Sequence, residues 1–122
     1  MTGPAGPAVA DVYLDACCFI YLVEGQPPWR SAIEARLRAL GPGARVVSSQ
    51  LSRLECRTKP LREGDHRLLA NYDALFAASR VAVRDLSAAA VDGATTLRAK
   101  YGFKSPDALH LASAVECGAV AF

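Results

Sequence analysis

The stretch SPDALHLASAVECGAVAF, Ser105–Phe122, predicts a helix that is followed at once by a strand. Ser105 is a typical N-cap residue, and Pro106 suits the first position of a helix because its ring already fixes a helical φ. Gly118 is typical of a residue that ends a helix. The apolar run Ala119–Phe122 then indicates the start of a buried strand. A helix that leads directly into a strand is the pattern of an α/β fold.

The same alternation of strands and helices continues toward the N-terminus. Strands are predicted at Val9–Leu14, Arg45–Ser48 and Val81–Val83. Helices are predicted at Trp29–Leu40, from Leu51 onward, at Asp65–Ser79 and at Ala88–Tyr101, the last with Ser87 as N-cap and Gly102 as stop. The apolar stretch Cys17–Val23 fits a helix or a buried strand, and Arg57–Gly64 is expected to be irregular because it contains Pro60. We therefore predict an α/β fold in which helices flank a mostly parallel sheet.

The length of 122 residues predicts a single domain. Residues 1–8, MTGPAGPA, are expected to be a flexible tail, and residues 9–122 to form the domain. The sequence stops at Phe122, where a buried strand should be starting, so we expect the domain to be truncated at its C-terminal end. No apolar run approaches the roughly 20 residues of a spanning helix, and residues 1–8 lack the charged and apolar regions of a signal peptide. A cytoplasmic protein without membrane contact is therefore expected.

The formal net charge of +2 is too small to indicate a nucleic-acid-binding protein by itself. Four bases near Glu55 are either a solvated face or contacts to RNA phosphates: Arg53, Arg57, Lys59 and Arg62. The four cysteines show no C-x-x-C spacing, which argues against a zinc or thioredoxin-like site. They are interpreted as reduced, buried, small hydrophobic residues in the cytoplasm: Cys17, Cys18, Cys56 and Cys117.

Three acidic residues stand where strands end or helices begin. Asp15 follows the first strand, Glu55 is on the helix after the second strand, and Asp107 is near the start of the helix opened by Ser105. In an open α/β sheet, functional sites gather at the carboxyl ends of the strands, so these acids are expected to converge. Converging carboxylates repel one another unless a cation joins them, and Mg²⁺ or Mn²⁺ accepts such oxygen ligands. The sequence therefore predicts a metal site formed by Asp15, Glu55 and Asp107.

Each of these acids also has a purely structural interpretation. Asp15 is a candidate N-cap residue. Glu55 lies three residues after Ser52, which is the spacing of a capping box. Asp107 suits the first turn of its helix because a negative charge there interacts favourably with the helix dipole. His110 follows Asp107 by one turn, and three roles are open to it: a hydrogen bond to Asp107, a half-buried helix residue or a metal ligand.

Three segments together resemble blocks of a known family: VYLDACCFIYLVEG, SSQLSRLECRTKPLREG and SPDALHLASAVECGAVAF. They are similar to the PIN-domain ribonucleases, in particular to the VapC-type toxins, and the similarity extends from Val9 to Phe122. The resemblance implies a parallel sheet sandwiched by helices, with Asp15, Glu55 and Asp107 helping to hold Mg²⁺ or Mn²⁺. It also implies an RNA substrate, a cognate antitoxin as partner and, because members often dimerise, a homodimer.

The sequence departs from the family pattern in two places. The family usually has a fourth Asp shortly after the strand that begins here at Ala119, and this sequence stops at Phe122, before that point. The family also usually has Ser, Thr or Asn two residues after the acid that matches Asp15, and Cys17 stands there in this chain. A thiol is a poor ligand for Mg²⁺, so the resemblance implies a metal site with less support than usual.

Three functions are consistent with the sequence, in descending order. The first is a metal-dependent endoribonuclease, the toxin of a toxin–antitoxin pair, in which a metal-activated water hydrolyses an RNA phosphodiester bond. The second is a catalytically incomplete PIN-fold protein that binds an antitoxin or RNA without cleaving it. The third is a phosphoacceptor domain, which requires an acidic pair at the end of the first strand, and only Asp11 accompanies Asp15 there.

Overall fold

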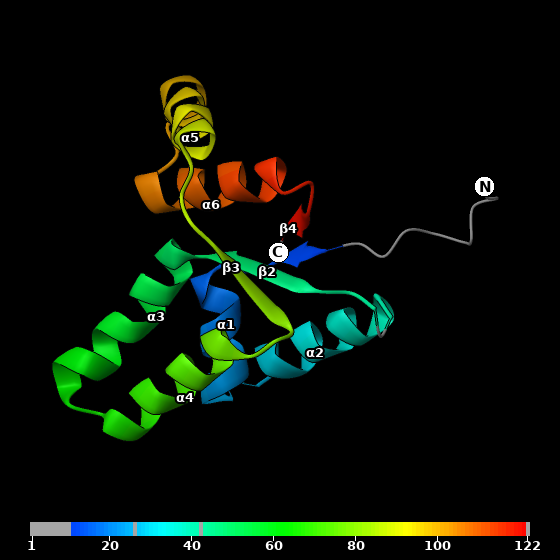
Figure 1. Cartoon of the computed structure of the whole chain (residues 1–122), viewed down its shortest axis with the longest axis vertical. Coiled ribbons are helices and arrows are strands. Elements are labelled where there is room, and N and C mark those ends of the chain that lie inside the picture. Colours follow the sequence, from blue (N-terminus) through cyan, green and yellow to red (C-terminus); the bar gives the residue numbers. More distant parts are fainter. Residues whose placement is uncertain (1–10, 26, 42, 122) are drawn as a thin grey trace.

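The computed structural model describes residues 11–25, 27–41 and 43–121 (Figure 1). Helices and strands follow one another in the order β1 (Val12–Tyr13), α1 (Ala16–Glu24), α2 (Trp29–Ala39), β2 (Val46–Ser49), α3 (Gln50–Glu63), α4 (His66–Ala77), β3 (Val81–Arg84), α5 (Ala88–Tyr101), α6 (Ser105–Glu116) and β4 (Val120–Ala121). The expected tail, residues 1–8, lies outside the described residues, as does Phe122. Among the helices described, none has the length and apolar character needed to cross a membrane.

The strands form one parallel sheet in the order β3–β2–β1–β4. β1 is a central strand, because Tyr13 pairs with Val47 of β2 on one side and with Ala121 of β4 on the other. β3 pairs with the outer side of β2 over four residue pairs that begin at Val46 and Val81. Parallel neighbours need crossover connections, which the helices supply. The predicted α/β fold, a parallel sheet flanked by helices, is confirmed.

Helices cover both faces of the sheet (Figure 1). Successive residues of an extended chain point to opposite faces, so Val12 and Leu14 face one layer and Tyr13 faces the other. The main core joins Val12 and Leu14 to buried residues of α1, α3 and α4: Ala16, Cys18, Phe19, Cys56, Tyr72 and Phe76. Tyr13 packs instead with Val47 and with Ala114 of α6. The sheet therefore separates the main core from a thinner layer beneath α6.

The stretch Cys17–Val23, which fits a helix or a strand from sequence alone, is helical. α1 begins after Asp15, whose side chain accepts a hydrogen bond from the Cys18 N–H, and ends at Gly25, where φ is 67°. A positive φ of this size is easily adopted only by glycine, so the helix stops there. Helical spacing then turns Cys18 and Phe19 into the main core.

The prediction of an irregular segment at Arg57–Gly64 is wrong. α3 continues through Pro60 to Glu63 and ends at Gly64. Proline inside a helix removes one backbone hydrogen bond and usually costs about 3 kcal/mol. Pro60 is buried, and its carbonyl accepts a hydrogen bond from the Asp65 N–H at 2.9 Å. Packing of the proline ring offsets part of this cost, so tertiary structure overrides the local preference.

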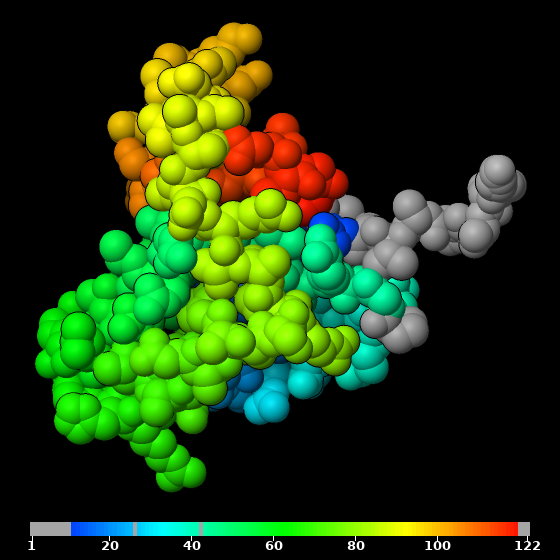
Figure 2. All heavy atoms as spheres, in the orientation of Figure 1, coloured from blue at the N-terminus to red at the C-terminus, as the bar shows by residue number. Residues whose placement is uncertain are grey.

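The helices α5 and α6 form a lobe on one side of the sheet, which we call the α5–α6 lobe (Figures 1 and 2). α5 packs chiefly against α6. Their contact is made by small residues, Ala90 and Ala94 of α5 with Ala108 and Ala112 of α6. The other side of α6 packs on the sheet through Ala114. Hence α6 connects the α5–α6 lobe to the rest of the molecule, which we call the body.

The predicted ends of the lobe helices are mostly confirmed. Ser87 caps α5 by accepting a hydrogen bond from the Ala90 N–H at 3.0 Å, and Gly102 ends it with a φ of 71°. The predicted N-cap of α6 is wrong by one residue, since Lys104 holds that position and Ser105 is the first helical residue. Among the residues that the structure describes, no side chain caps the N-terminus of α6. Pro106 lies in the first turn, where a helix has unbonded N–H groups in any case and the absence of one from proline costs nothing.

The cysteines differ in their exposure. Cys18 and Cys56 are buried in the main core, as predicted. Cys117 is half-buried and Cys17 is exposed, so the prediction of burial is wrong for Cys17. Each of the four is a free thiol in the structure.

Candidate functional site

Asp15 lies two residues beyond the end of β1 and is the N-cap of α1. Its Oδ1 atom accepts a hydrogen bond from the Cys18 N–H at 3.2 Å, so the capping interpretation is confirmed. The residue is half-buried at the edge of the sheet where β1 ends. The cap engages one carboxylate oxygen, so capping a helix and binding a cation are compatible roles for Asp15.

Glu55 lies on α3, and its side chain is 30% exposed. Its Oε1 atom is 2.7 Å from Nε2 of His110 on α6. The capping-box interpretation of Glu55 is wrong, because α3 begins at Gln50 with Ser49 as N-cap, which places Glu55 beyond the first turn. The partner of Glu55 thus comes from a helix that is distant in sequence.

Asp107 lies in the first turn of α6, as predicted, and is exposed. Within the described part of the chain its carboxylate makes no hydrogen bond and no ion pair. Its charge interacts favourably with the α6 dipole, by a few tenths to about 1 kcal/mol for an exposed acid. An exposed carboxylate without a protein partner is also available to a cation.

The pKa of the Cys17 thiol responds to the charges of all three acids. Partial shielding of the thiol from water by its neighbours is the largest effect that raises the pKa of Cys17, and the negative charges of Asp15, Glu55 and Asp107 raise it further. Interactions between charges weaken with distance and are screened by salt. The contacts agree with this proximity, since Cys17 follows Asp15 in the first turn of α1 and His110, one turn after Asp107 on α6, contacts Glu55.

The chemistry of these three side chains suits a hard divalent cation. Carboxylate oxygens are the ligands that Mg²⁺ and Mn²⁺ prefer. Across residues 11–25, 27–41 and 43–121, however, no group of three or more His, Cys, Asp or Glu side chains is close enough to hold a metal ion. Glu55 is engaged by His110 instead, and like charges repel where no cation joins them. Asp15, Glu55 and Asp107 are therefore neighbours of suitable chemistry, and their oxygens are not gathered around one point.

A buried chain of hydrogen bonds runs from the sheet to Glu55. The Tyr13 hydroxyl is 2.9 Å from Ser49 Oγ and 2.8 Å from His110 Nδ1. The other ring nitrogen of His110 contacts Glu55. Burial raises the pKa of Tyr13 above its ordinary value, which already lies well above neutral pH, so the hydroxyl is a hydrogen-bond donor. Of the roles considered for His110, the hydrogen bond to Asp107 is not formed, and its partners are Tyr13 and Glu55.

Sequence reasoning did not single out Tyr13 and missed its place in this chain of hydrogen bonds. The signal that identifies it is the period of two along β1. That period separates Tyr13 from Val12 and Leu14 and turns it toward the face that α6 covers. A buried tyrosine needs a partner for its hydroxyl, and the sequence offers one on α6 in His110.

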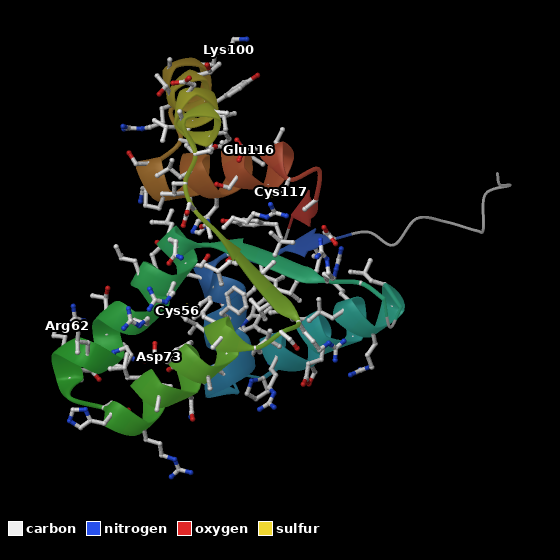
Figure 3. All side chains as sticks on the ribbon, in the orientation of Figure 1. Cys56, Arg62, Asp73, Lys100, Glu116 and Cys117 are labelled. Carbon is white, nitrogen blue, oxygen red and sulfur yellow. The ribbon has the colours of Figure 1, made fainter. Side chains whose placement is uncertain are left out.

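The bases predicted to contact RNA lie on two different sides of α3: Arg53, Arg57, Lys59 and Arg62. Helix residues four or seven apart share a face, so Lys59 and Arg62 lie on the side of Glu55, and Arg53 and Arg57 on another. Arg57 is also engaged, since its Nε donates a hydrogen bond to Asp73 Oδ1 of α4 at 2.8 Å. Figure 3 shows Arg62 on the outer side of α3 and Asp73 on the side of α4 that faces α3. The predicted cluster is therefore split.

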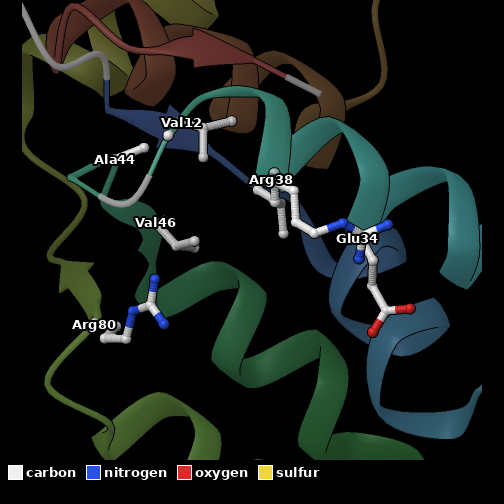
Figure 4. Close-up of a pocket in the computed structure, with 8 residues that line it drawn as sticks. Val12, Glu34, Arg38, Ala44, Val46 and Arg80 are labelled. Carbon is white, nitrogen blue, oxygen red and sulfur yellow. The ribbon is translucent and has the colours of Figure 1, made fainter.

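A cavity of about 630 Å³ lies at the opposite edge of the sheet. Val12 and Val46, the first residues of β1 and β2, line it together with Arg38 and Arg80 (Figure 4). Asp15 follows the other end of β1. This cavity is therefore separate from the neighbourhood of the three acids.

The family model of the PIN domain matches residues 12–122 of the sequence. The chain belongs to the PIN-domain family. The match covers every described element and includes Asp15, Glu55 and Asp107. No curated protein matches the sequence of this PIN domain.

Solved structures share the fold of this PIN domain at low sequence identity. VapBC2 of Rickettsia felis, bound to a DNA fragment from its promoter, superposes with a TM-score of 0.75 at 16% identity, over 91% of this chain and 85% of the other. VapC20 of Mycobacterium tuberculosis, a toxin that cleaves the sarcin–ricin loop, superposes with a TM-score of 0.72 at 20% identity, over 88% of this chain and 84% of the other. A toxin–antitoxin complex from Klebsiella pneumoniae superposes with a TM-score of 0.68 at 22% identity, over 90% of this chain and 82% of the other. These similarities establish a common fold.

Proposed function

We propose that this PIN domain is a metal-dependent endoribonuclease and the toxin of a toxin–antitoxin pair. The observation that supports the proposal most is the position of Asp15, Glu55 and Asp107. Asp15 follows β1, Glu55 lies on α3 and Asp107 lies on α6, and the bond between Glu55 and His110 joins α3 to α6 one turn from Asp107. An α/β fold typically binds its ligands at the carboxyl ends of its parallel strands, and these acids lie near that edge of the sheet.

Asp15, Glu55 and Asp107 would hold Mg²⁺ or Mn²⁺, directly or through water molecules. A bound divalent ion supplies a water of lowered pKa and neutralises charge on the scissile phosphate. Asp15 is oriented for this role by its cap on α1, and Glu55 by its contact with His110. The exposed position of Asp107 leaves its carboxylate open to solvent and to substrate.

RNA would approach along the side of α3 that carries Glu55. Lys59 and Arg62 are exposed on that side, and in the described part of the chain neither has an ion pair. Arg57 is held by Asp73 on another side of the helix. We therefore assign the phosphate contacts to Lys59 and Arg62 more than to Arg53 and Arg57.

The partners belong to the same proposal. The structures of like fold from R. felis and K. pneumoniae are toxin–antitoxin assemblies, which supports an antitoxin as the partner of this chain. A homodimer is proposed on the family resemblance. A cytoplasmic location is proposed because four free thiols suit a reducing compartment.

The proposal is tested by cleavage of single-stranded and structured RNA with Mg²⁺ or Mn²⁺ and with EDTA. Asp15→Asn, Glu55→Gln and Asp107→Asn keep size and polarity and remove one charge each, so each should lower the rate at least about 100-fold. Asp107→Asn should change the free energy of unfolding by less than about 1 kcal/mol. Asp92→Asn on α5 is the matched control, since it removes an exposed acid far from Cys17 in sequence. Cleavage that persists in EDTA contradicts the proposal.

A second candidate function is a PIN-fold protein that binds an antitoxin or RNA without cleaving it. The observation in its favour is that no group of three metal-binding side chains is assembled among the described residues. The two functions differ in a Mn²⁺ titration of the intact chain. Binding of RNA without Mn²⁺ binding and without cleavage favours the second.

A further inference from the structure

The buried chain Ser49–Tyr13–His110–Glu55 links the three elements that carry the acids. Tyr13 lies on β1, two residues before Asp15, and His110 lies on α6, one turn after Asp107. Glu55 itself ends the chain on α3. Each of the three acids is therefore within three residues of a member of one continuous set of hydrogen bonds.

The members of this chain are held in fixed positions. Tyr13 is 1% exposed and Ser49 is fully buried, and His110 is 9% exposed. The Tyr13 and His110 rings also contact each other edge to face, with centroids 5.8 Å apart. A short bond at each ring nitrogen fixes the plane of the imidazole.

With the Glu55 carboxylate ionised, two arrangements of protons are consistent with these distances, and both give the same contact to Glu55. If Tyr13 donates to Ser49, Nδ1 of His110 donates to Tyr13, and the ring is a cation with a proton on Nε2. If Ser49 donates to Tyr13, Tyr13 donates to Nδ1, and the neutral ring again carries its proton on Nε2. A carboxylate only accepts hydrogen bonds, so Nε2–H donates to Glu55 Oε1 in either case.

We propose that His110 is a positioning residue that orients the Glu55 carboxylate, with Tyr13 and Ser49 fixing the ring. The bond engages Oε1 and leaves Oε2 for a cation or its water. This inference rests on the proposed function for its effect on metal binding, whereas the proton on Nε2 is a property of the free protein. Partners of this kind, which orient a metal-binding side chain, typically change metal affinity by about 10–100-fold.

The test compares three replacements of His110. His110→Gln retains an amide N–H near the position of Nε2, whereas His110→Asn reaches only the position of Nδ1, and His110→Leu has no donor. In a titration with Mn²⁺, His110→Leu and His110→Asn should weaken Mn²⁺ binding about 10–100-fold. His110→Gln should retain most of the native affinity. Tyr13→Phe should have a smaller effect, because the bond to Glu55 remains. His66→Gln, at the other histidine and exposed on α4, is the matched control.

A second readout uses the metal-free protein. The ¹⁵N NMR spectrum of the imidazoles should show a proton on Nε2 of His110 that exchanges slowly, and Glu55→Ala should make it exchange quickly. Equal Mn²⁺ affinity in folded His110→Gln and His110→Leu proteins overturns the inference, as does a proton on Nδ1 alone. If the native chain binds no Mn²⁺ and the slow Nε2 proton is present, the proposed function fails while the positioning of Glu55 stands.

Discussion

The main core and the α5–α6 lobe pack their helices in opposite ways. In the main core, large side chains of α1 and α4 interlock, and the rings of Phe19 and Phe76 meet edge to face at 5.0 Å. In the lobe, alanines meet alanines, and a Cβ added at Gly93 would lie 3.3 Å from the Cβ of Ala112. Small side chains let helices approach closely but bury little apolar area per residue.

The candidate site spans these two regions. Asp15 and Glu55 belong to the body, and Asp107 belongs to the lobe. Glu55 contacts the lobe through its hydrogen bond with His110 of α6. We therefore expect the body to determine the global stability and the lobe to determine how closely the third acid approaches the other two.

The largest expected effect on stability is a cavity in the main core. Phe19→Ala removes a side chain that is 1% exposed and should lower the free energy of unfolding by about 3–5 kcal/mol, measured by urea denaturation. Leu61→Ala on α3 is the control, because that leucine is largely exposed and its loss should change stability by less than about 0.5 kcal/mol. Similar losses for the two variants would refute the contrast.

Overpacking should disturb the lobe more selectively. Ala94→Leu inserts three carbons into the contact of α5 with α6 and should cost about 1–3 kcal/mol. Hydrogen exchange should show α5 amides opening before those of α1. Ala99→Leu, at an exposed position of the same helix, should leave stability and exchange almost unchanged. Equal acceleration of exchange throughout the body would mean that the lobe is not a separate unit.

High pH should lower the free energy of unfolding because of two buried thiols in the body. Burial raises the pKa of Cys18 and of Cys56 to about 12, whereas an unfolded thiol ionises near about 8.5. Between these values the unfolded chain releases protons that the folded chain retains, so stability falls as pH rises. Each thiol contributes a slope of about 1.4 kcal/mol per pH unit. In reduced protein, Cys56→Ala should lessen the fall of the free energy of unfolding between pH 9 and about 11 by about 1.4 kcal/mol per pH unit. The same dependence on pH in the variant and the native protein would contradict this prediction.

The smallest expected effect concerns the surface of the body. Arg57 and Asp73 form an ion pair between α3 and α4, with side chains 33% and 46% exposed. Asp73→Asn should change the free energy of unfolding by no more than about 1 kcal/mol, because solvent and salt screen exposed pairs. The difference should shrink further in 1 M NaCl, where the Debye length is about 3 Å. A larger loss would show that this pair holds the two helices together.

Much of the fold was predictable because its signals are local. Ser87 and Gly102 bound α5 as expected, since capping depends on neighbouring backbone groups. Pro60 was misjudged because the packing that compensates for it comes from residues distant in sequence. Cys17 was misjudged for a similar reason, as its exposure depends on which side of α1 faces the sheet.

The sequence by itself determined the type and order of most elements, with Cys17–Val23 and Arg57–Gly64 as exceptions. It thereby placed Asp15, Glu55 and Asp107 after strands or at a helix start. Hydrophobic periodicity, caps and glycines act within a few residues, so they can be recognised in a single amino-acid sequence. Only the tertiary structure decided that Glu55 faces His110, that Tyr13 joins them, and that Lys59 and Arg62 part from Arg53 and Arg57. Such contacts join residues far apart in sequence, and their geometry depends on how whole helices pack across the sheet.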